Sequence, residues 1–138
     1  MGIKKYLGLE RRRFSRYATA VDVMFHVWDA RKEKPLTPRV KGRLTDISQG
    51  GACLQTNQTL IEGYHLLLDK DMEGQTPVIL EVQQAAGSEP FTIQAQVLWY
   101  NQVTSERKYK FDVGLEFVDL TSEQRERLNT LLTTAAES

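Results

Sequence analysis

Apolar and polar residues alternate along several short stretches of the chain, and this period-two pattern is typical of half-buried β-strands. The two clearest stretches have an apolar residue at every second position: Val21, Val23, Phe25 and Val27 in one, and Phe111, Val113, Leu115 and Phe117 in the other. The second stretch extends over 109–118, and further strands are expected at 40–47, 52–56, 64–68, 78–82 and 91–100. Pro35, Pro38 and the pair Gly50-Gly51 predict the turns between them.

The last part of the chain has a helical period instead. Apolar residues recur every three or four positions, at Leu128, Leu131, Leu132 and Ala135, and so form one stripe on a helix. Thr121 and Gln124 have the spacing of a capping box, which predicts where this helix begins. Six or seven short antiparallel strands with one amphipathic helix favour a compact β-barrel, because a closed barrel leaves no sheet edge exposed. The helix is expected to pack against the barrel.

Length and charge limit the possible functions. A chain of 138 residues fits one domain, which we divide into an N-terminal arm (1–17), a barrel (18–120) and a helix (121–138). The formal net charge is zero, which argues against a general nucleic-acid binder. Six basic residues and one acidic residue nevertheless give residues 1–16 a charge of +5, so the remainder carries −5. Such a cationic arm on an acidic body indicates a local anion site.

The cellular location is expected to be the cytoplasm. The single cysteine, Cys53, cannot form an intramolecular disulfide, which fits a reducing compartment, and its apolar neighbours predict a buried side chain. No stretch approaches the roughly 20 apolar residues that span a bilayer. The N-terminus has lysines without an apolar core, so we expect neither a signal peptide nor membrane insertion.

The sequence lacks the signals of the common metal and enzyme sites. His26 and His65 stand alone, without cysteines or carboxylates at the spacing of a zinc site, so no metal is expected. There is no glycine-rich phosphate loop ending in Lys-Ser/Thr and no GxSxG motif. Asp46 and Ser48 have no histidine partner for nucleophilic catalysis. We therefore predict a protein without enzymatic activity or a cofactor.

One segment with candidate chemistry is 46–51, Asp-Ile-Ser-Gln-Gly-Gly. If the preceding strand continued through it, Asp46 and Ser48 would lie on one face and present a carboxylate and a hydroxyl side by side. Gly50 and Gly51 permit positive φ and let a ligand or another backbone approach closely. Taken alone, the segment is better explained by an ordinary turn that closes a hairpin.

The other segment is the arginine-rich stretch 10–17, Glu-Arg-Arg-Arg-Phe-Ser-Arg-Tyr. Guanidinium groups match phosphate oxygens and the O6/N7 edge of guanine with two hydrogen bonds, and they stack on purine faces. Taken alone, this stretch is explained by a solvated basic tail.

Together, the two segments resemble the paired signature of the PilZ domain family, RxxxR followed by (D/N)xSxxG. The matching positions are Arg12 and Arg16 in the first motif, and Asp46, Ser48 and Gly51 in the second. The order of the motifs and the strand–turn–strand passage between them also match. The resemblance continues through the Val97-Leu98-Trp99 strand, the strand 113–117 and the terminal helix, so it covers most of the chain.

The resemblance implies a six-stranded antiparallel barrel that binds cyclic di-GMP, with a mobile arginine arm that wraps the ligand against the barrel surface. Arg12 and Arg16 would contact guanine and phosphate groups. Asp46 and Ser48 would accept from the donors on the Watson–Crick edge of guanine, and Gly51 would hold the turn open. It further implies a bacterial receptor or adaptor that changes conformation on ligand binding and passes the signal to an unidentified partner protein.

Two further residues are candidates for the ligand site. In this family an arginine just before RxxxR, here Arg11, is associated with an intercalated dimer of the nucleotide, which predicts two nucleotides per chain. Trp99 is a candidate stacking platform. Its alternation with Phe91, Ile93, Ala95 and Val97 would place it on the core face instead, and both interpretations stay open at this stage.

Three alternatives compete with a nucleotide receptor. A PilZ-like scaffold could act by protein contacts alone, although family members of that kind typically lack the motif residues. A barrel that binds RNA or single-stranded DNA would need basic and aromatic residues across a sheet face, whereas positive charge here is concentrated in the arm, so neither DNA nor RNA is expected. A flavin-dependent barrel enzyme is the most distant alternative.

Overall fold

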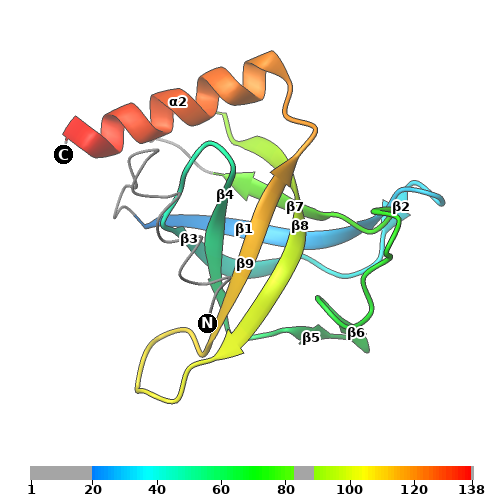
Figure 1. Ribbon diagram of the computed structural model, residues 1–138. Coiled ribbons are helices and arrows are strands. Elements are labelled where there is room, and N and C mark those ends of the chain that lie inside the picture. Colours follow the sequence, from blue (N-terminus) through cyan, green and yellow to red (C-terminus); the bar gives the residue numbers. More distant parts are fainter. Residues whose placement is uncertain (1–19, 83–88, 138) are drawn as a thin grey trace.

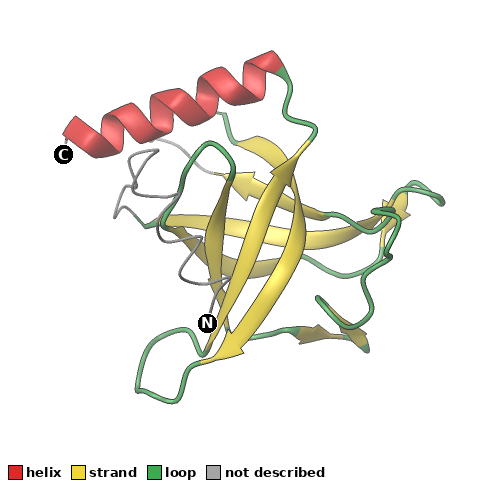
Figure 2. Ribbon diagram, in the orientation of Figure 1, coloured by secondary structure: helices red, strands yellow, loops and turns green. Residues whose placement is uncertain are grey.

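The structure is a computed structural model that describes residues 20–82 and 89–137, with side chains described as far as Leu132. The arm expected at 1–17, with Arg11, Arg12 and Arg16, lies outside the described residues. The remaining chain folds as six long strands, a few short ones and one helix (Figure 2).

The strands and the helix follow the alternation and the period in the sequence closely. Their bounds are β1 Val21–Asp29, β2 Lys34–Pro35, β3 Val40–Thr45, β4 Gly51–Thr56, β5 Leu60–Ile61, β6 Tyr64–His65, β7 Val78–Val82, β8 Phe91–Gln102, β9 Phe111–Val118 and α2 Ser122–Glu137. The expected strand at 64–68 is shorter, because its second half folds into turns held by the His65 side chain. Nδ1 of His65 accepts from the backbone N–H groups of Leu67 and Leu68, both at 3.1 Å.

The long strands close into a barrel. Their order is β1-β3-β4-β9-β8-β7, and β7 pairs back onto β1, which closes the barrel (Figure 1). Every neighbouring pair is antiparallel. Closure removes the exposed edges that an open sheet of this size would have. The mainly β fold with a six-stranded antiparallel barrel and a C-terminal helix is therefore confirmed.

The barrel interior is the hydrophobic core. The alternating apolar residues of β1, β7, β8 and β9 all point inward, and Phe25, Leu80, Ile93 and Val113 are fully buried. Helix α2 lies across one end of the barrel (Figure 1), where Leu128 and Leu132 from its apolar stripe join the core. The small sheet β5–β6 lies toward the other end (Figure 1).

The capping box at the start of α2 is confirmed. Gln124 N–H donates to Thr121 Oγ1 at 3.1 Å, and Thr121 N–H donates to Gln124 Oε1 at 2.8 Å. The Gln124 side chain also donates to the carbonyl of Thr92 on β8, at 2.7 Å. The same residue therefore caps the helix and fixes it to the barrel. Within the described part of the chain, no helix is long and apolar enough to cross a membrane.

Candidate functional site

The segment 46–51 is the turn between β3 and β4, and it lies beneath α2 at one end of the barrel (Figure 1). The Gln49 side chain donates to Asn129 of the helix. Strand β3 ends at Thr45, two residues earlier than expected, because Asp46 has a positive φ of 50° that breaks the extended backbone. The expected side-by-side placement of Asp46 and Ser48 through strand alternation is therefore wrong. A turn, not a strand, sets their directions.

The Ser48 hydroxyl organises this turn. It donates to the carbonyl of Gly51 and accepts from Gly50 N–H, both at 3.3 Å, while the backbone N–H of Ser48 also donates to Gly51 O at 2.9 Å. These are the local side-chain-to-backbone bonds that favour serine in turns. The hairpin turn that the sequence alone left open is thus present, and any ligand contact by Ser48 would share its hydroxyl with the turn.

Two reasons were expected for a glycine at position 51, a positive φ and the close approach of another backbone. Gly51 has no positive φ, and close packing is what requires it. A Cβ at this position would lie 2.1 Å from the carbonyl oxygen of Leu115 on β9. That oxygen is backbone of a paired strand and cannot move aside as a side chain could. The other expected reason, close approach of a second backbone, is the one observed.

A row of residues starts next to this turn and follows the outer surface around about half of the barrel. Register pairs place Thr45 opposite Cys53, Cys53 opposite Gly114, and Gly114 opposite Trp99, so the row runs over β3, β4, β9 and β8. Gly114 faces outward because its neighbours Val113 and Leu115 point into the core. With strands about 4.8 Å apart, the path along the barrel surface from Thr45 to Trp99 is about 14 Å long.

Trp99 belongs to this outer row and not to the core. Val97 pairs with Leu115, but Trp99 pairs with the adjacent Gly114, so Leu98 is an extra residue that forms a β-bulge. A bulge shifts the alternation by one position and turns the following side chain to the opposite face. The expectation that Trp99 shares the core face of Val97 is therefore wrong.

The indole of Trp99 packs on the bare backbone of Gly114. A Cβ on Gly114 would lie 2.2 Å from both Cε2 and Nε1 of the ring. The ring is half-buried, which leaves part of it accessible from outside the barrel. This contact was not predicted, although a glycine inside a strand often marks a close approach and could have indicated it. The sequence did not indicate that Trp99 is the residue that packs on Gly114.

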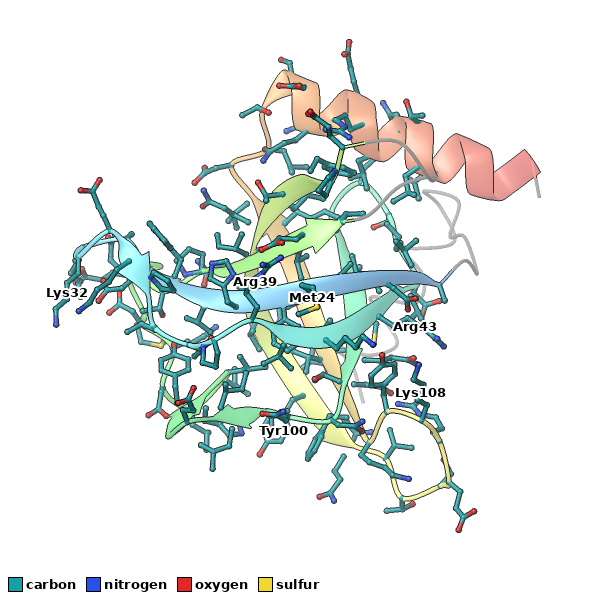
Figure 3. The ribbon with its side chains drawn as sticks, turned by 180° about the vertical axis from the view of Figure 1, so that it is seen from behind. Met24, Lys32, Arg39, Arg43, Tyr100 and Lys108 are labelled. Carbon is teal, nitrogen blue, oxygen red and sulfur yellow. The ribbon has the colours of Figure 1, made fainter. Side chains whose placement is uncertain are left out.

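The chain that leads out of the arginine-rich segment joins the barrel beside the same turn. Val21, at the start of β1, pairs with Leu44, two residues before Asp46. Arg43, the residue before Leu44, lies on the outer face of β3 (labelled in Figure 3). Its guanidinium is 3.5 Å from the Asp22 carboxylate and 5.7 Å from the centroid of the Tyr109 ring. Arg43 was not expected near the site, although its parity with Thr45 could have indicated it.

Cys53 is buried as expected, at 8% exposure, but it lies in the outer row and not in the core. No group of three or more histidine, cysteine, aspartate or glutamate side chains that could hold a metal ion occurs among residues 20–82 and 89–132.

Comparison with known proteins identifies the family. The family model of the PilZ domain matches residues 10–134, which include both motifs and the whole barrel. The chain belongs to the PilZ domain family. This PilZ domain resembles two solved structures with a TM-score of 0.51 each. One is the PilZ domain of CeSA from a cellulose-synthesizing bacterium, at 16% identity over 88% of this chain and 97% of that one.

The other is the PilZ domain of YcgR from Escherichia coli with c-di-GMP, at 14% identity over 91% of this chain and 92% of that one. At these identities the likeness shows the fold alone. Among curated proteins, none matches the chain.

Proposed function

We propose that this PilZ domain is a receptor for cyclic di-GMP, which binds on the outer face of the barrel between the 46–51 turn and Trp99. The observation that carries the proposal is that one register row on the outside of the barrel connects two of three features, while the third joins the barrel beside the turn at its β3 end. The features are the (D/N)xSxxG turn, the half-buried Trp99 ring at the end of the row, and the start of β1, which follows the RxxxR motif in the sequence.

The family and one of its structural neighbours support the ligand. The YcgR domain was solved with c-di-GMP, and the family match here begins at residue 10 and so includes both motif arginines. Arg16 stands five residues before Val21, and five residues of chain span at most about 18 Å. Chain length therefore allows Arg16 to reach a ligand on the outer row. Arg12 would act with it on guanine and phosphate groups.

The remaining roles follow from the chemistry of guanine. Its N1–H and 2-amino groups are donors, and the Asp46 carboxylate and the Ser48 hydroxyl can accept from them. Trp99 offers an aromatic face on which a purine can stack. Gly51 keeps β4 close to β9 and so holds the turn in place. Arg11 would stack between purines of an intercalated dimer, which gives two nucleotides per chain.

Binding would order the arm against the barrel and change the surface offered to a partner protein in the cytoplasm. In this role the protein is a signal receptor and adaptor, not an enzyme. The alternative is a PilZ scaffold that acts by protein contacts without nucleotide. The two motifs favour the receptor, because a scaffold of that kind has no need of the five motif residues.

Isothermal titration with cyclic di-GMP tests the proposal. Arg16→Ala should weaken binding roughly a hundredfold, since a lost charged hydrogen-bonding partner costs about 2–3 kcal/mol. Arg13→Ala, which changes a neighbouring arginine outside the motif, is the matched control and should bind as the parent does. Cyclic di-AMP should not bind, because adenine lacks the N1–H and 2-amino donors.

The outcomes are distinct. Absence of binding at tens of micromolar cyclic di-GMP would leave the scaffold alternative. Equal binding by Arg16→Ala and the parent would reject the role of that arginine while keeping the receptor. Saturation at one nucleotide per chain would reject the intercalated dimer and the role of Arg11.

A further inference from the structure

Lys70 lies at the bulge that turns Trp99 outward. Its ammonium group donates to the carbonyl oxygen of Val97 at 2.7 Å. Val97 is the last residue of β8 before the extra residue Leu98, and Trp99 follows directly. Lys70 comes from the connection between β6 and β7, which is distant in the sequence from β8.

The Val97 carbonyl lies where β8 loses one of its neighbours. Strand β7 begins at Val78, which pairs with Ala95, and the residue before it is Pro77, which has no N–H to donate. Beyond Ala95, β8 therefore continues without β7. A half-buried carbonyl without a donor is costly, and Lys70 supplies a charged donor at this point.

The connection that carries Lys70 is held by its own hydrogen bonds. Asp71 N–H donates to Thr76 Oγ1 at 2.8 Å, Gln75 N–H donates to the Asp71 carboxylate at 3.0 Å, and Tyr64 and Thr76 join their hydroxyls at 3.1 Å. A second contact reaches β8, where the Gln96 side chain donates to Gly74 O at 3.5 Å. The ammonium thus comes from an ordered loop.

Lys70 has no acidic partner in the described ranges. The ion pairs there join Arg31, Arg39, Arg43 and Arg107 to carboxylates, and none includes Lys70. Its side chain is half-buried, and the polar contact it makes is the Val97 carbonyl. A lysine that served only to add surface charge would extend into solvent and would not donate to a backbone carbonyl.

We propose that Lys70 is a positioning residue for Trp99. By holding the Val97 carbonyl, Lys70 fixes the bulge at Leu98, and the bulge in turn places the Trp99 indole on Gly114 at the outer face. The effect on ligand affinity rests on the proposed function, whereas the effect on the indole does not. Lys70 itself touches no ligand in this scheme and acts through Trp99.

The test uses the full chain with Trp28→Phe, so that Trp99 is the remaining one of the two tryptophans. Lys70→Met keeps the length and apolar stem of the side chain but removes the donor, and Lys70→Arg restores one. Lys32→Met, at an exposed turn residue, is the matched control. The measurements are the indole N–H resonance of Trp99 by NMR, its fluorescence, and titration with cyclic di-GMP.

Lys70→Met should shift and broaden the indole resonance and weaken binding about tenfold, whereas Lys70→Arg and Lys32→Met should match the parent. An unchanged indole resonance in Lys70→Met overturns the proposal, whereas a shifted resonance with unchanged affinity supports the positioning role and rejects Trp99 as a ligand contact. If the parent does not bind cyclic di-GMP, the proposed function fails, yet the indole comparison still decides whether Lys70 positions Trp99. If Lys70→Met does not fold, Lys70→Ala, which also removes the donor, is compared with Lys70→Arg by the same criteria.

Discussion

The indole ring of Trp99 occupies the space that a side chain at Gly114 would need, so the two residues form one unit on the outer face of the barrel. Atoms Cε2 and Nε1 of the ring would both lie 2.2 Å from a Cβ at position 114. The bulge at Leu98 brings Trp99 opposite Gly114 in the register of β8 and β9. Any larger residue at 114 must therefore displace the proposed stacking platform.

Gly114→Ala should displace the Trp99 ring and destabilise the fold by about 1–3 kcal/mol, the usual cost of overpacking. Denaturant unfolding gives the free energy, and near-UV circular dichroism reports the tryptophan environment. Gly50→Ala is the matched control, because a Cβ there meets no atom within 4 Å. Equal stability of the two variants would show that Trp99 gives way without cost.

Gly51→Ala should be more damaging than Gly114→Ala. The clash at Gly51 is with the backbone carbonyl of Leu115, at 2.1 Å, and relieving it requires β4 and β9 to separate. We expect a loss of about 3 kcal/mol or more in the free energy of unfolding. Gly50→Ala again serves as the control, and a loss smaller than that of Gly114→Ala would contradict the argument.

Removing either side chain of the capping box of α2 should lower the free energy of unfolding. Thr121→Ala removes the hydroxyl that accepts from Gln124 N–H, and loss of an N-cap typically costs about 0.5–2 kcal/mol. Gln124→Ala should cost more, since it also removes the hydrogen bond to Thr92 on β8. Ser122→Ala, at an exposed neighbour, is the control in thermal unfolding. A larger loss for Ser122→Ala would place the cap elsewhere.

Stability should fall in mild acid because of His26. Burial lowers the pKa of its imidazole, the nearby Arg39 lowers it further, and Glu81 opposes the shift. Its Nδ1 is buried without a hydrogen-bond partner among the described residues. With the folded pKa below the unfolded value of about 6.5, the unfolded chain binds more protons in the interval between them. Stability is then retained above pH about 6.5 and lost as the pH falls through the folded pKa.

Urea unfolding of the parent and of His26→Gln across this range measures the effect. The difference in unfolding free energy between the two proteins should be constant above pH about 6.5. Below that pH the parent should lose stability relative to His26→Gln. His65 is present in both proteins and cancels in the comparison. A difference that stays constant throughout the range would remove His26 as the cause.

Much of the fold could be predicted from local pattern. The alternation in 21–27 and 111–117 specified strands, because a strand with one buried face needs apolar residues at every second position. The stripe of leucines after residue 127 and the pair Thr121 and Gln124 specified the helix and its start. These features depend on residues that are close in the sequence, so the sequence is sufficient to reveal them.

The candidate site was predictable as a set of residues but not as a geometry. The positive φ of Asp46 ended β3 early, and the bulge at Leu98 reversed the face of Trp99. Both are single-residue departures from alternation. At the bulge, the contacts are made with residues distant in the sequence, Trp99 with Gly114 and Val97 with Lys70. The sequence by itself thus determined the strands, the helix and the candidate residues of the site. The tertiary structure decided which way they face, because a shift of one residue turns a strand side chain from the core to the surface.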